Sequence, residues 1–135
     1  MVIRLRTASL PPVYGILFAR FLTLLMLVGS PWPKRQRNDE FFELRLRPLL
    51  AKRCYECHRR RAEAGLRLDS LKRIKEGGQS GPAIVVGDAE KSLLWQVVSG
   101  NHDDIEMPPD SPLKTNEIKV LKQWISDGAY WPAPK

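Results

Sequence analysis

Apolar residues recur at helical spacing after residue 37, and this pattern predicts a first helix that is capped by Asn38 or Asp39 and delivers Cys54 at its end. Pro48 lies inside this helix. Because proline lacks a backbone N–H, we expect one lost hydrogen bond and a kink there. The residues that share one face of the helix are Phe42, Leu46, Leu49, Leu50 and Arg53.

Three further segments, 67–76, 88–100 and 115–127, show the same periodicity and predict three more helices. Glycines at 77, 78 and 128 end two of them. The apolar face of segment 67–76 consists of Leu68, Leu71 and Ile74. The face of segment 88–100 consists of Leu93, Leu94, Val97 and Val98, and Trp95 lies outside it. The face of segment 115–127 consists of Ile118, Leu121, Trp124 and Ile125. The pattern as a whole predicts an all-α domain.

Two of these helices carry start signals. Ser92 follows a short acidic stretch in the third helix. Thr115 is the expected cap of the last helix, but Ile118 stands where an acidic residue would complete a capping box. We therefore expect the last helix to begin without that reciprocal cap.

Residues 1–30 contain no acidic residue and read as a targeting segment. Arg4 and Arg6 precede the apolar stretch 21–29, as in a signal peptide, and the run 13–29 is near the lower length limit of a membrane-spanning helix. We expect either a cleaved signal peptide or a retained transmembrane anchor. Both possibilities predict a protein that lies in the periplasm, or that is anchored in the membrane with its domain facing the periplasm.

The chain of 135 residues is long enough for one small domain after this segment. Residues 31–37 read as a proline-flanked basic linker that we expect to be extended. Residues 38–132 are then the domain itself.

The stretch Cys54-Tyr55-Glu56-Cys57-His58 carries the clearest chemical signal. C-x-x-C-H is the pattern for covalent attachment of a c-type haem, in which both thiols form thioethers and His58 supplies an axial imidazole. A zinc site, a thioredoxin-like dithiol and a plain disulfide are alternatives. Zinc would need ligands from Cys54, Cys57, His58 and His102, which is a poorly spaced set, and no βαβ pattern surrounds the cysteines. We therefore predict one covalent haem c.

Met107 is the candidate for the second axial ligand, because methionine sulfur raises the potential of haem in cytochromes c. Met1 is the initiator and Met26 lies in the apolar N-terminal run, whereas Met107 precedes two prolines that stiffen its segment. Methionine also fills gaps in ordinary cores. His102 as the ligand, or an open sixth position, are the other outcomes.

Several further motifs occur in the order found in the planctomycete-type cytochrome c domain, which residues 38–132 resemble. They are Phe41-Phe42-Glu43, Arg47-Pro48-Leu49-Leu50, Cys54 to His58, Gly65-Leu66-Arg67-Leu68-Asp69, Gly77 to Val85, Lys91-Ser92-Leu93-Leu94 and Met107-Pro108-Pro109. This sequence reads Val85-Val86-Gly87 where Val-Pro-Gly is expected. In that family the domain usually begins a longer secreted or membrane-attached protein.

The resemblance to cytochromes c also implies two contacts around the haem. The first and last helices should cross, through Phe42, Leu46, Leu121 and Trp124. The glycine-rich segment 77–87 should pass near His58, where the backbone carbonyl of Pro82 would accept a hydrogen bond from its other ring nitrogen. That segment lacks the Gly-Lys-Ser/Thr ending of a nucleotide-binding loop.

Together these features predict a c-type cytochrome that carries single electrons outside the cytoplasm, and not an enzyme. The alternative is a haem-based redox or gas sensor, or an interaction module. A peroxidase would need an open site and a second polar group. The net charge is +7. The basic residues near the motif suit an acidic redox partner, a plain solvated face, or compensation of the two haem propionates; they are Lys52, Arg53, Arg59, Arg60 and Arg61. No nucleic-acid-binding motif is present.

Overall fold

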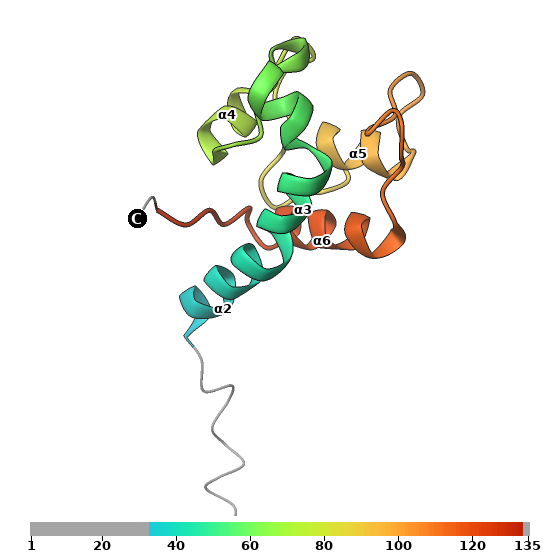
Figure 1. Ribbon diagram of the computed structural model, residues 1–135. Coiled ribbons are helices and arrows are strands. Elements are labelled where there is room, and N and C mark those ends of the chain that lie inside the picture. Colours follow the sequence, from blue (N-terminus) through green and yellow to red (C-terminus); the bar gives the residue numbers. More distant parts are fainter. Residues whose placement is uncertain (1–32, 134–135) are drawn as a thin grey trace, which may run out of the picture. The chain divides into compact units, whose positions relative to one another are not determined.

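The computed structural model describes residues 33–133, and the part from Lys34 onward forms one compact unit. Its helices are α2 (Lys34–Phe41), α3 (Arg47–Arg53), α4 (Leu71–Glu76), α5 (Leu93–Ser99) and α6 (Thr115–Ser126), with π-helical η1 (Phe42–Leu46) and η2 (Glu56–Arg61) and the 3₁₀ turn η3 (Glu63–Gly65) (Figure 1). The described residues contain no strand, only two isolated bridges. The predicted helical class is confirmed for this part of the chain.

The proposed signal peptide or anchor, with the run 13–29, lies outside the described residues. Among the residues that the structure describes, no helix has the length and apolar character needed to cross a membrane.

The first helical stretch is longer than predicted. It runs without interruption from Lys34 through α2, η1 and α3 to Arg53. The expectation of an extended segment over 31–37 is therefore wrong for residues 34–37, and Asn38 and Asp39 are not caps. Lysine, arginine and glutamine are good helix formers, and Pro33 precedes the first helical residue, where a missing N–H does no harm.

Pro48 explains why the middle of this stretch is π-helical. Pro48 stands in the first turn of α3, directly after η1, and Arg47 donates its backbone N–H to the carbonyl of Phe42, five residues earlier. Such a widened turn is one of the usual ways in which a helix absorbs an irregularity. The predicted disturbance at Pro48 is present, as a π-helical segment.

The first stretch packs against α6, as the resemblance to cytochromes c implied (Figure 1). Phe42, Leu46, Leu121 and Trp124 are all buried in one core. Trp131 joins them from the C-terminal segment, with its ring 4.7 Å from that of Phe42 and 6.2 Å from that of Trp124. Burial of several large side chains at one crossing is the main favourable term for so small a domain.

The two middle helices begin later than predicted. α4 starts after Ser70, whose hydroxyl accepts a hydrogen bond from the Arg73 backbone at 3.3 Å, so Leu68 is buried but precedes the helix. α5 starts after Ser92 rather than at Asp88. Serine competes for nearby backbone groups and so favours the cap position over the helix interior.

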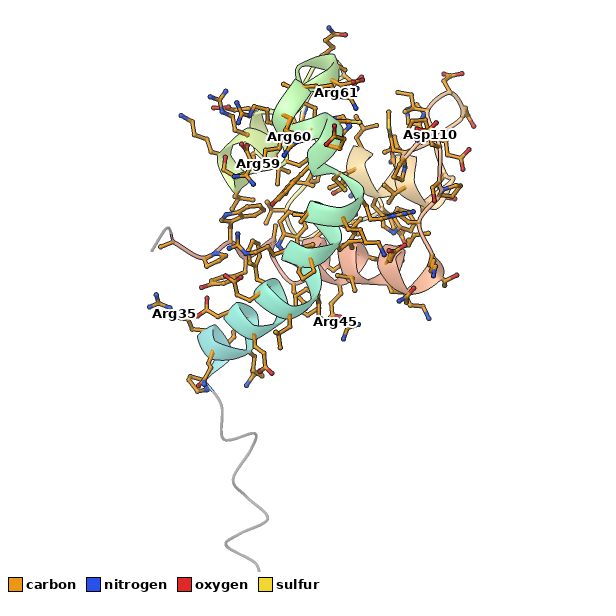
Figure 2. The ribbon with its side chains drawn as sticks, in the orientation of Figure 1. Arg35, Arg45, Arg59, Arg60, Arg61 and Asp110 are labelled. Atoms are coloured by element: carbon orange, nitrogen blue, oxygen red, sulfur yellow. The ribbon has the colours of Figure 1, made fainter. Side chains whose placement is uncertain are left out.

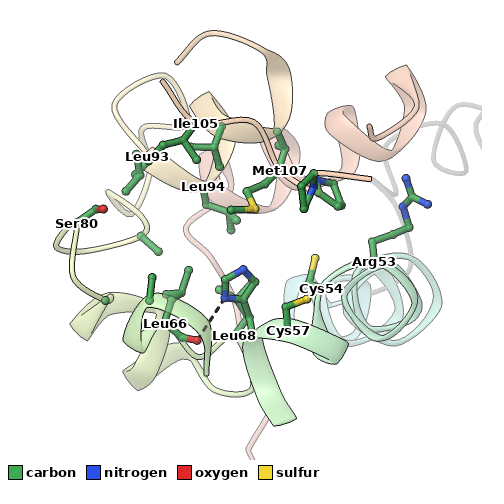
Figure 3. A pocket seen from close by; sticks show the side chains of 18 of the residues that line it. Arg53, Cys54, Cys57, Leu66, Leu68, Ser80, Leu93, Leu94, Ile105 and Met107 are labelled. Atoms are coloured by element: carbon green, nitrogen blue, oxygen red, sulfur yellow. Dashed lines mark hydrogen bonds between the residues drawn. The ribbon is translucent and has the colours of Figure 1, made fainter. Parts of the chain in front are cut away.

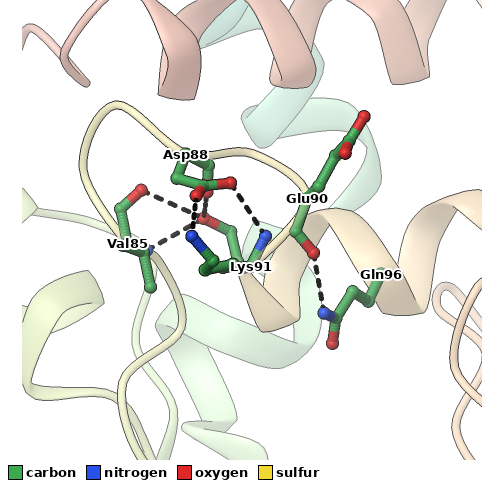
Figure 4. A network of polar contacts seen from close by, with 6 residues as sticks. Val85, Asp88, Glu90, Lys91 and Gln96 are labelled. Carbon is green, nitrogen blue, oxygen red and sulfur yellow. Dashed lines mark hydrogen bonds and ion pairs between the residues drawn. The ribbon is translucent and has the colours of Figure 1, made fainter.

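The Ser92 hydroxyl makes no capping bond to α5 and instead forms a polar network with Val85 and Asp88, which Figure 4 labels. Its hydroxyl donates to the Asp88 carbonyl at 2.7 Å and accepts from the Val85 backbone N–H at 2.9 Å, and its side chain is fully buried. Asp88 also accepts a 2.7 Å contact from the Lys91 ammonium, which lowers the pKa of that carboxyl. The turn 85–92 is thereby fixed in front of α5.

The start of α6 differs from the prediction by one residue. The cap position is Lys114, and Glu117, three residues later, accepts a 2.8 Å hydrogen bond from the Lys114 backbone N–H. Ile118 is therefore irrelevant to the cap, and the acidic half of a capping box is present.

Candidate functional site

A largely apolar cavity lies between the C-terminal side of α3, the glycine-rich segment and the chain that precedes α6 (Figure 3). Its volume is about 880 Å³ when the open space at its mouth is included. The apolar residues on its wall include Leu66, Leu68, Ala83, Leu93, Leu94, Val97, Val98, Ile105 and Leu113. Burying an apolar ligand of this size would add stability that the small core lacks.

Both cysteines lie on one wall of this cavity (Figure 3). Cys54 caps α3 and is buried, Cys57 follows in η2 and is half-buried, and both thiols are free. Burial raises the pKa of the Cys54 thiol to about 12. Arg61, one helical turn after Cys57, directs its guanidinium to the Cys57 Sγ at 3.2 Å. The two thiols therefore share the cavity but differ in environment.

His58 lines the same cavity, and its Nδ1 lies 3.4 Å from the backbone carbonyl of Leu66. The predicted acceptor, Pro82, is therefore wrong. After η3 the chain turns back along η2, where the Leu68 N–H donates to the His58 carbonyl at 2.8 Å. The glycine-rich segment packs behind this returning chain, because the Gln79 N–H donates to the Ala64 carbonyl at 2.8 Å. Leu66 lines the cavity beside His58, whereas Pro82 is not among the residues of the cavity wall.

Met107 lies across the cavity from Cys54 and Cys57 (Figure 3). Its backbone N–H donates to the Val97 carbonyl of α5 at 2.9 Å, which fixes where the side chain starts. Pro108 and Pro109 follow it on the cavity wall. The sequence-predicted residues Cys54, Cys57, His58 and Met107 are brought together around one space.

His102, the rival ligand, is not part of the cavity wall. Its Nδ1 accepts hydrogen bonds from the backbone N–H groups of Asp104 and Ile105, both at 3.2 Å. Those contacts give the side chain a local role in shaping its own turn.

Two residues of the site carried no clear signal in the sequence. Leu66 contributes a main-chain carbonyl, which any residue could supply. Arg53 lines the cavity and contacts Ser111 and Pro112, whereas the sequence suggested a basic surface group. Its place at the end of an apolar helical stripe was the one available hint.

The charges around the cavity are separated by sign. Arg59, Arg60 and Arg61 are exposed on η2, while Asp110 belongs to the Met107 segment (Figure 2). Two of these arginines form ion pairs with nearby glutamates: Arg60 with Glu56 at 3.8 Å, and Arg61 with Glu63 at 3.4 Å. Exposed Asp103, Asp104 and Glu106 accompany Asp110. The basic character predicted near the motif therefore applies to the cysteine side of the cavity alone.

A helical domain whose apolar cavity is lined by C-x-x-C-H and a methionine has the composition of a c-type cytochrome. The family model described as Planctomycete cytochrome C matches residues 54–111, which include both cysteines, His58 and Met107. This match confirms the family resemblance for the segment that builds the cavity. Neither the curated proteins nor the solved structures gave a match.

Proposed function

We propose that this protein carries single electrons outside the cytoplasm by means of one covalently attached haem c. The observation that supports this most directly is the meeting of Cys54, Cys57, His58 and Met107 on the wall of one apolar cavity. The four residues come from two segments that are far apart in the sequence. Their convergence is what a covalent site with two axial ligands requires.

The residues present fit a haem. Two free thiols are available for thioether bonds, an imidazole and a thioether sulfur are the axial donors found in cytochromes c, and the remaining wall is mostly apolar. When bound, haem supplies an iron that changes its oxidation state by one electron.

The chain's own groups set the conditions for that chemistry. The Leu66 carbonyl can accept a hydrogen bond from the His58 Nδ1–H, which orients the ring and would make Nε2 a stronger electron-pair donor to iron. The apolar wall would exclude water from a bound haem, and the Met107 thioether is the kind of ligand that would favour the reduced form of its iron. We infer that His58 and Met107 would together hold the iron of a bound haem and raise its potential, in agreement with electron carriage rather than catalysis.

We further propose a periplasmic or membrane-anchored location and a protein redox partner that approaches the cavity mouth. The basic side chains of η2 would attract acidic groups of such a partner and raise the encounter rate at low salt. The acidic residues of the Met107 segment would repel the same groups, so the approach is expected from the cysteine side.

The test is a haem stain on a denaturing gel after co-expression of the full chain with a cytochrome c maturation system. We expect haem to stay with the wild-type band and to be lost in Cys54→Ala/Cys57→Ala. Exported wild-type protein without bound haem would refute the proposal.

Ligation is tested with Met107→Ala and the matched control His102→Ala. We expect the first variant alone to lose the methionine-to-iron absorption band and to bind CO. A wild-type protein that lacks this band, with CO binding gained in His102→Ala and not in Met107→Ala, would give the axial role to His102. A wild-type protein that binds CO readily would favour gas sensing over electron transfer.

A further inference from the structure

Arg53 makes a set of contacts that attachment and ligation of haem leave unexplained. It is the last residue of α3, directly before Cys54, and it lines the cavity. Its side chain is 17% exposed, unlike the neighbouring Lys52, which is exposed. A guanidinium withdrawn from water needs partners that compensate for lost hydration.

Those partners belong to the segment that carries Met107. Arg53 Nη2 donates to the Ser111 carbonyl at 2.6 Å, to the Pro112 carbonyl at 2.9 Å and to the Ser111 hydroxyl at 3.3 Å. Two of the three acceptors are main-chain atoms. Arg53 therefore holds the path of the backbone rather than one particular side chain.

The composition of that segment explains why it needs an external donor. Residues 107–113 contain three prolines, at 108, 109 and 112, and each lacks a backbone N–H. Such a segment offers carbonyls but few donors, so it cannot form its own ladder of hydrogen bonds. Arginine has five N–H donors in a rigid fork and no acceptor, which suits closely spaced carbonyls.

A fourth contact extends the link to α6. Arg53 Nε lies 3.8 Å from Glu117 Oε1, and the side chain of Glu117 is 19% exposed. The other oxygen of Glu117 accepts the Lys114 N–H at the start of α6. Partly buried ion pairs of this kind are screened less by salt than surface pairs are. Arg53 thus joins the end of α3, the Met107 segment and the start of α6.

The Met107 segment is then held at both ends. On one side the Met107 N–H bonds to the Val97 carbonyl of α5 at 2.9 Å. On the other side Arg53 fixes Ser111 and Pro112. Between these points lie the two stiff prolines. The backbone that carries the Met107 side chain can move away only if one of the two attachments opens.

We propose that Arg53 is a positioning residue that keeps the Met107 sulfur directed into the cavity by clamping residues 111 and 112. This rests on the proposed function, since it takes Met107 as an axial ligand. The proposal connects the two sides of the site, because Arg53, which directly precedes Cys54, also holds the segment that carries Met107.

The test compares Arg53→Gln with wild type as full-length, haem-loaded protein. We expect covalent haem to remain, the methionine-to-iron band to weaken, and CO affinity to rise about tenfold, the effect of losing ~1.4 kcal/mol from charge-assisted hydrogen bonds. Hydrogen exchange should be faster at Met107 and Leu113, whereas exchange in the C-terminal half of α6, away from Glu117, should stay as in wild type.

Matched variants separate clamping from general destabilisation. Arg47→Gln removes another arginine of α3, one that pairs with Glu43 at the surface, and should leave CO binding unchanged. Ser111→Ala keeps both carbonyl acceptors and should resemble wild type. Glu117→Gln and Arg53→Lys should each shift CO binding in the same direction by a smaller factor, which also covers the case that Arg53→Gln does not fold.

The proposal is overturned if Arg53→Gln keeps the wild-type band and CO affinity, or if Arg47→Gln changes both equally. It is also overturned if Arg53→Lys and Glu117→Gln both behave as wild type. Failure of the proposed function would be seen earlier and differently, as absence of covalent haem from the wild-type protein.

Discussion

The Tyr130 hydroxyl donates a 2.6 Å hydrogen bond to the Asp39 carboxylate and so connects the C-terminal segment to α2 across 91 positions of sequence. This bond raises the pKa of Tyr130, because it stabilises the protonated phenol beside a negative charge. The Tyr130 backbone carbonyl accepts the indole N–H of Trp124 at 2.8 Å. Tyr130 thereby holds the chain that places Trp131 on the core.

Tyr130→Phe is expected to lower the thermal midpoint by a few degrees, since it keeps the ring but removes a hydrogen bond to a charged group. Circular dichroism melts would measure the change. In a double-mutant cycle with Asp39→Asn, the two changes should be less than additive. Full additivity would show that the bond contributes nothing in solution.

The Cys54 thiol makes the haem-free protein sensitive to alkali. Its pKa is raised by burial to about 12, above the ordinary value of 9.0. A group with a raised folded pKa stabilises the fold below its unfolded pKa, and this contribution is lost as the pH rises toward the folded pKa. The free energy of unfolding should therefore fall between pH 9 and about 12, by up to about 4 kcal/mol.

Urea unfolding at successive pH values measures this loss, with Cys54→Ala as the control that lacks the titrating group. The haem-loaded protein is a second control, because a thioether sulfur does not titrate. Equal pH dependence in wild type and Cys54→Ala would contradict the assigned burial of the thiol.

Helical periodicity predicted most of the fold because each helix buries one continuous apolar stripe. The stripes of α5 and α6 are buried nearly as expected, and Cys54 ends α3 as predicted. The starts of α2, α4 and α5 were missed. The position of a cap depends on which polar side chain reaches a free backbone N–H, as the Ser70 hydroxyl does for Arg73. The spacing of apolar residues contains no information about that contact.

The site residues were predictable where chemistry demands a particular side chain, as in Cys54, Cys57, His58 and Met107. The supporting contacts were not. The His58 ring is held by a main-chain carbonyl. Arg53 donates hydrogen bonds to Ser111 and Pro112, which follow it by 58 and 59 positions in the sequence. Such contacts arise from the tertiary path of the chain and leave no local pattern.

Leu121 tests the crossing between the first helical stretch and α6. It is fully buried in the shared core, so Leu121→Ala should reduce the free energy of unfolding by about 2–5 kcal/mol through lost burial and a cavity. Leu44→Ala is the matched control, because Leu44 is 65% exposed on η1. It should change stability by less than about 0.5 kcal/mol. Equal losses would contradict the observed packing.

Gly77 tests whether the glycine-rich segment is shaped by close packing or only by backbone conformation. Gly77 has φ +76°, and a Cβ placed on it would lie 1.8 Å from the Gly81 carbonyl oxygen and 2.7 Å from the Pro82 Cα. Gly87 has a similar φ of +87°, but a Cβ there would meet nothing within 4 Å. The two positions therefore share a positive φ and differ in the available space.

Gly87→Ala should lower the free energy of unfolding by about 1 kcal/mol, the usual effect of a side chain at positive φ. Gly77→Ala should lower it by more than about 3 kcal/mol, because the carbonyl in its way is main chain and cannot rotate aside. It should also displace Gly81, which lines the cavity, and so reduce the yield of haem-loaded protein. Chemical denaturation of both variants measures the difference. Similar losses at the two sites would mean that Gly77 is required for its backbone conformation alone.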